Sequence, residues 1–176
     1  QNGIVDYIGR VLAVLGQAVP QFLVGIILIW IFYIKLGWFP ASNRVSPDAT
    51  NAFVDAFQHL FLPVTTLTIG MVAVLMRYAR NAMLDVLNSD YVLFARARGE
   101  RGILRRHVLR NMALPAITLQ FASVGEIIGG SVLVEQVFSY PGLGQAAVAA
   151  GLGGDLPLLL GITVVTAAVV FGGNLA

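Results

Sequence analysis

The sequence has 176 residues, of which 57% are hydrophobic and only 11% are charged; its formal net charge is +2 and its mean hydropathy is +0.81. Soluble domains are roughly 45–50% apolar and about 25% charged, so this composition excludes a soluble globular chain and indicates a membrane protein. The sequence has no cysteine, which excludes disulfides, thiolate metal sites and cysteine nucleophiles.

Four stretches are long and apolar enough to form transmembrane helices, each of which needs about 20 mostly apolar residues. They cover approximately 11–34, 58–80, 111–134 and 156–176. Apart from two arginines at the end of the second stretch, Glu126 is the only charged residue in them. The sequence therefore predicts an all-α, polytopic membrane helix bundle that forms a single domain over 1–176. Because it begins with Gln1 and stops inside an apolar run, we expect a fragment of a longer chain.

Each predicted span contains a proline. Pro63 and Pro157 are expected near helix starts, where the missing N–H would have had no partner in any case. Pro20 and Pro115 are instead expected to kink their helices.

Positive charge gathers in one connection between spans. Eight of the eleven Lys and Arg residues lie in the segment 77–110: Arg77, Arg80, Arg96, Arg98, Arg101, Arg105, Arg106 and Arg110. The positive-inside rule predicts that 77–110 is cytoplasmic and that 38–55 and 138–155 lie outside, with interfacial aromatic anchors at Trp30, Trp38, Phe39 and Tyr140. Since two spans flank the arginines, topology and partner docking explain them better than nucleic-acid binding does.

Within the segment 77–110 the pattern predicts a short helix. Asn88 and Ser89 are good N-cap residues, Asp90 suits the first turn, and Gly99 suits a helix end. The predicted helix, Asp90–Arg98, exposes Tyr91, Val92, Phe94, Ala95 and Ala97. So short a helix is not stable alone; it either docks in a groove of a soluble partner or rests on lipid headgroups.

The cytoplasmic loop and three further segments together resemble the permease subunits of bacterial ABC importers, in the dipeptide/oligopeptide form with its cytoplasmic "EAA" loop. Any one of these matches would be weak, but they follow in the right order on the predicted sides of the membrane. In the loop they are Asp90-Tyr91, Ala95-Arg96-Ala97-Arg98-Gly99, Leu109-Arg110-Asn111 and Leu114-Pro115-Ala116. The others are Leu36-Gly37-Trp38-Phe39-Pro40-Ala41-Ser42; Leu62-Pro63-Val64 with Arg77 and Arg80-Asn81-Ala82-Met83-Leu84; and Gly129-Gly130-Ser131-Val132-Leu133-Val134-Glu135 with Phe138-Ser139-Tyr140-Pro141-Gly142-Leu143-Gly144.

The resemblance implies an ABC type I importer permease fold, of which about four of six spans are present, in a multi-pass protein of the bacterial plasma (inner) membrane. It implies four kinds of partner: a second homologous permease subunit, two ABC ATPases, an extracytoplasmic substrate-binding protein and the lipid bilayer. The segment 89–99 would be the coupling helix, with Asp90, Tyr91, Phe94, Ala95, Ala97, Arg98 and Gly99 at the ATPase contact. We expect no catalytic residue, cofactor or metal, and no GxxxxGK[ST] motif occurs.

The span 111–134 carries two further predictions. Gly125 and Gly129 form a small-xxx-small pair that favours close helix packing. Helical spacing places Gln120, Ser123 and Glu126 on one stripe, which either lines the pore or lies hydrated near the outer end of the span. A secondary transporter or another polytopic membrane channel subunit is the alternative function. For a secondary transporter, Glu126 is the sole intramembrane ionisable candidate and no internal repeat is visible.

Overall fold

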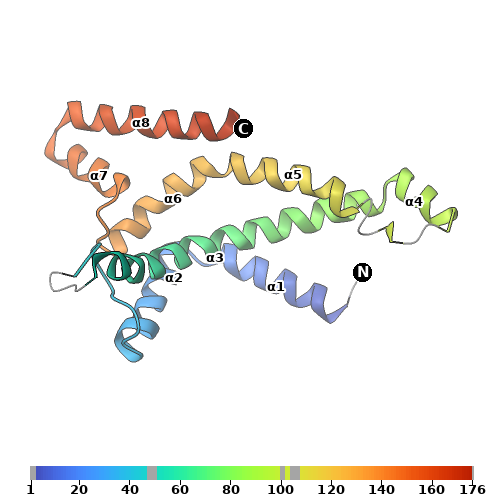
Figure 1. Cartoon of the computed structure of the whole chain (residues 1–176), viewed down its shortest axis with the longest axis horizontal. Helices are drawn as coiled ribbons and strands as arrows, with labels where there is room; N and C mark the ends of the chain where they lie inside the picture. The colour runs from blue at the N-terminus through green and yellow to red at the C-terminus, as the bar shows by residue number, and fades with distance from the viewer. Residues whose placement is uncertain (1–2, 47–50, 100–101, 104–107, 176) are drawn as a thin grey trace. The chain divides into compact units, whose positions relative to one another are not determined.

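The computed structural model describes residues 3–46, 51–99, 102–103 and 108–175. All regular elements in this part of the chain are helices (Figure 1), which confirms the predicted all-α class. The chain divides into two compact units, one of Gln1–Gln17 with Val72–Ser123 and one of Ala18–Met71 with Val124–Ala176.

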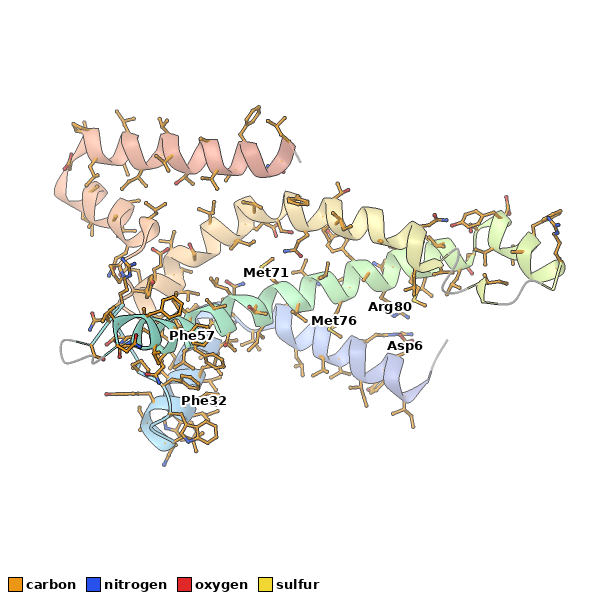
Figure 2. All side chains as sticks on the ribbon, viewed as in Figure 1. Asp6, Phe32, Phe57, Met71, Met76 and Arg80 are labelled. Atoms are coloured by element: carbon orange, nitrogen blue, oxygen red, sulfur yellow. The ribbon has the colours of Figure 1, made fainter. Side chains whose placement is uncertain are left out.

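The first unit contains α1 (Ile4–Ala18), the second half of α3 (Ala52–Leu87), α4 (Asp90–Ala97) and α5 (Leu109–Ala122). An ion pair joins α1 to α3 (Figure 2): Arg80 donates from Nε and Nη2 to the Asp6 carboxylate, at 2.8 and 3.3 Å. Arg10, one turn after Asp6, donates to the same carboxylate at 2.7 Å. The polar ends of these two helices are therefore held together by charge.

The second unit contains α2 (Gln21–Leu28), the π-helical segment η1 (Ile29–Lys35), the first half of α3, α6 (Val124–Val137), α7 (Leu143–Gly153) and α8 (Leu156–Leu175). Its core is built on the buried side chains of Leu62, Val134 and Phe138. A Cβ added at Gly25 would lie 3.1 Å from Cε2 of Phe138, so a residue without a side chain lets α2 approach α6.

The proline predictions have different outcomes. Pro157 is the second residue of α8, as expected of a proline in a first helical turn, and Pro20 lies between the end of α1 and the start of α2. The prediction for Pro63 is wrong, because α3 begins at Ala52 and carries Pro63 in its interior. The apolar window marks where a helix can meet lipid, whereas the helix itself begins earlier, at Ala52.

The helices relate to the predicted spans as follows. α3 contains the whole of 58–80, and α8 covers 156–175. The stretch 11–34 is divided at Pro20, and 111–134 is divided at Ser123 into α5 and α6. Among the described residues, α3 and α8 are the helices long and apolar enough to cross a membrane, with a third crossing if α1 and the α2–η1 segment make one broken span.

Candidate functional site

The predicted coupling helix is present as α4, and the ends of this helix have identifiable causes. The carbonyl of Ser89 accepts the N–H groups of Val92 and Leu93, both at 3.1 Å, and so begins the helix. The Ser89 hydroxyl donates backwards to the carbonyl of Val86, so its expected side-chain capping of α4 is not observed. At the other end Gly99 has φ +72°, the left-handed conformation that glycine adopts without steric cost.

α4 has a buried side and an exposed side. Val92 is 0% and Ala95 is 7% exposed, while Tyr91, Leu93 and Phe94 are 44%, 51% and 67% exposed. The expectation that Val92 and Ala95 are exposed is therefore wrong, because other residues of the chain cover them. α4 is anchored through two small side chains and presents two aromatic rings and a leucine outward.

A hydrogen bond also connects α4 to the beginning of α5. The side-chain amide of Asn111 donates to the hydroxyl of Tyr91 at 2.9 Å. These residues come from opposite ends of the loop motif, 20 positions apart, and the sequence alone does not predict that they meet. The bond restrains α4 through the side chain of Tyr91, the residue that precedes buried Val92. Of the loop's arginines, Arg101, Arg105 and Arg106 lie outside the described residues.

The predicted pore stripe does not lie on one uninterrupted helix. Gln120 and Glu126 are exposed and Ser123 is half-buried, but the helix is broken at Ser123, whose hydroxyl donates to the carbonyl of Leu119 at 2.7 Å. Back-bonding of this kind bends helices. The 3.6-residue spacing that placed the three residues together therefore does not continue from α5 into α6, and their pore-lining role stays a prediction.

The two glycines predicted to pack closely differ in what they face. A Cβ added at Gly125 would lie 3.4 Å from Cγ1 of Val170 in α8, an ordinary contact distance, whereas a Cβ added at Gly129 would meet no described residue within 4 Å. Both glycines line an open, mainly apolar groove of about 900 Å³ between α6, α7 and α8. Gly125 thus faces a helix of the same chain, and Gly129 faces the open groove.

Another carboxylate, Glu135 near the end of α6, makes more contacts than Glu126. It accepts the backbone N–H of Gln145 in α7 at 2.8 Å and the hydroxyl of Ser131 at 3.2 Å. We did not assign Glu135 a role from the sequence. The signal that could have identified it is an acidic residue shortly before Gly142-Leu143-Gly144, a glycine-rich helix start whose N–H groups need an acceptor.

The segment before α3 is organised by Asp55. Its carboxylate accepts the N–H of Ser46 at 2.6 Å and the Ser46 hydroxyl at 3.0 Å. Its backbone carbonyl lies 2.9 Å from Nδ1 of His59, a histidine that is 5% exposed. These contacts give His59 a structural role at the start of α3, while His107 lies outside the described residues.

Comparison with known proteins relates these elements to a transport family. Residues 1–176 match the family described as binding-protein-dependent transport system inner membrane component. The chain is 41% identical over 173 residues to the oligopeptide transport system permease protein AppB of Bacillus subtilis, across 97% of this chain and 55% of that protein. It is 39% identical over 150 residues to the glutathione transport system permease protein GsiC of Pectobacterium atrosepticum, across 84% of this chain and 46% of that protein. The present chain spans about half the length of the curated relatives that it matches.

Proposed function

The chain belongs to the family of binding-protein-dependent transport system inner membrane components, and from this premise we propose that it is part of the permease subunit of an ATP-driven importer of peptides. The family has the ABC type I permease fold, so the predicted polytopic membrane helix bundle is confirmed. Membership also confirms the resemblance drawn from these sequence segments.

The observation that carries this proposal is the geometry of α4. A docking element must be held firmly by its own subunit and must offer side chains that the subunit leaves uncovered. Val92, Ala95 and the Tyr91–Asn111 bond meet the first condition, and the exposed ring of Phe94 meets the second. We propose that Asp90, Tyr91, Phe94, Ala97, Arg98 and Gly99 form the contact with an ATPase subunit and that buried Ala95 supports the helix beneath it.

The remaining assignments follow from this role. The segment 77–110 is cytoplasmic, 38–55 and 138–155 face an extracytoplasmic binding protein, and the protein crosses the bacterial inner membrane several times. It works with a second homologous permease subunit and two ATPases, which supply the hydrolysis, so the chain itself is not an enzyme. Gln120, Ser123 and Glu126 are candidate contacts of the passing solute, while Gly125 and Gly129 are candidate packing positions. Two relatives carry oligopeptide and glutathione transport in their names, which supports a peptide or a similar small solute.

The test is solute uptake by the full-length permease reconstituted with its partner subunits in vesicles. Uptake of a short peptide is expected to require ATP hydrolysis and the binding protein, and to continue when ionophores collapse the ion gradients. A secondary transporter would behave in the opposite way. Uptake that follows the proton or sodium gradient and ignores ATP would overturn the proposal.

A further inference from the structure

The carboxylate of Glu135 occupies the N-terminal end of α7. Gln145 is the third residue of that helix, and its N–H is one of the groups that have no partner within the helix itself. Glu135 reaches it from α6 at 2.8 Å, so a negative charge sits at the positive end of the α7 dipole. The Ser131 hydroxyl, one turn earlier on α6, donates to the other carboxylate oxygen at 3.2 Å.

Two glycines make room for this contact. A Cβ added at Gly142 would overlap the Glu135 carboxylate, and one added at Gly144 would lie 2.8 Å from Cα of Val132, closer than real Cβ atoms approach backbone. The start of α7 can therefore lie against α6 because positions 142 and 144 have no side chains.

The turn between the two helices is fixed as well. The Tyr140 N–H donates to the carbonyl of Glu135 at 2.8 Å, and the Asn43 N–H donates to the carbonyl of Phe138 at 3.1 Å. Phe138 itself is 1% exposed in the core of the second unit. The corner from α6 to α7 is thus closed by a backbone bond within the turn, tied to the loop at Asn43 and anchored in the core by Phe138, while Glu135 adds the charged contact.

Apart from the Glu135 contact, α7 is held by packing: Ala150 is buried, and the helix packs against α6 and α8. Its 11 residues, LGQAAVAAGLG, include no charged side chain, and Leu152 is 87% exposed. In Figure 1 α7 lies between α6 and α8, the two helices with which it makes its contacts. A short helix without ion pairs of its own depends on contacts outside it for a fixed orientation.

We propose that Glu135 is a positioning residue that locks α7 to α6, so that docking of a solute-loaded binding protein on the outer face is transmitted directly to α6. This inference rests on the proposed function, because it needs a binding protein on the side of 138–155. Since α6 also carries the candidate pore residue Glu126, a rigid α6–α7 corner links the docking surface to the predicted solute path.

The experiment measures ATP hydrolysis by the complete reconstituted transporter against the concentration of solute-loaded binding protein. For Glu135→Leu we expect the half-maximal concentration to rise about tenfold, the effect of losing a hydrogen bond to a charged group. Basal hydrolysis without binding protein stays as in wild type. Glu135→Gln keeps an acceptor oxygen and loses the charge, so its shift is smaller. Gln136→Leu is the matched control, a neighbouring exposed polar residue of the same helix.

A second pair of variants tests the contact while residue 135 itself stays unchanged. Gly144→Ala pushes α7 away from α6 and is expected to reproduce the Glu135→Leu shift, whereas Gly151→Ala, where a Cβ meets nothing within 4 Å, is expected to match wild type. If Glu135→Leu and Gly144→Ala behave like their controls, the positioning role is rejected. It is also rejected if both variants lower basal hydrolysis by the same factor as they lower the hydrolysis stimulated by the binding protein. A wild-type complex that the binding protein does not stimulate would instead reject the proposed function, and this inference with it.

Discussion

Replacing Phe94 by alanine separates docking from folding, because this side chain is 67% exposed in its own subunit. Removing so exposed a ring should change the stability of the permease by no more than about 0.5 kcal/mol. An aromatic anchor buried in a partner's groove is worth about 2 kcal/mol or more, which corresponds to a loss of affinity of roughly 30-fold. Val92 is the opposite case: it is fully buried, so Val92→Ala should destabilise the loop itself by about 2 kcal/mol.

The assay titrates the membrane-embedded permease complex with labelled ATPase subunits and measures thermal stability in parallel. Phe94→Ala is expected to weaken ATPase binding with an unchanged melting temperature, whereas Val92→Ala is expected to lower the melting temperature. Phe53→Ala is the matched control, since Phe53 is 84% exposed on α3 in the segment predicted to lie outside. If the Phe94→Ala permease binds the ATPase as tightly as the Phe53→Ala permease does, α4 is not the docking helix. The alternative, that α4 rests on lipid headgroups, is then favoured.

Three further predictions address topology, the end of α4 and the pore. Single cysteines at Ser42 and Asn88 should react with impermeant reagents from opposite sides of the membrane, and labelling from one side would refute the predicted topology. Gly99→Leu places a branched side chain at φ +72°, a strain of about 1–2 kcal/mol, and should abolish peptide uptake while membrane insertion, checked by fractionation, is retained. Glu126→Gln preserves the shape of the side chain and removes its charge, so uptake in flux assays should change by less than about tenfold with assembly intact. A complete loss of uptake would show that the carboxylate is essential.

Local chemistry allowed α4 to be predicted closely. The expected helix Asp90–Arg98 and the observed Asp90–Ala97 differ by one residue, and Gly99 has the left-handed conformation that its position suggested. Hydrophobic composition likewise sufficed for the helical class and for α8. These features depend on residues close together in the sequence, so a pattern of neighbours contains the necessary information.

What could not be predicted depends on how one element packs against another. Val92 looks like any other residue of α4, and the sequence does not show that it is completely buried. Glu135 likewise becomes an acceptor for the Gln145 N–H only because α7 lies against α6. The break at Ser123 was missed because an apolar run of 24 residues from 111 to 134 satisfies the length rule for a span, although one helix ends at Ala122 and the next begins at Val124.

The last prediction concerns Gly129, where the structure makes the packing hypothesis sharper than the sequence did. Gly125 already faces Val170, and the Cβ added by Gly125→Ala would make an ordinary contact with it, so this variant should be tolerated. A Cβ added at Gly129 meets nothing within 4 Å among the described residues. Leucine is also the better helix former by about 0.8–1.0 kcal/mol, so the chain alone gives no reason for Gly129→Leu to be harmful. If Gly129→Leu lowers co-purification with the second permease subunit, we therefore expect the cause to be a clash between the leucine and a neighbour from outside this part of the chain. Gly161→Leu on α8, equally open, is the control; if both variants assemble normally, Gly129 faces lipid and close packing is confined to Gly125.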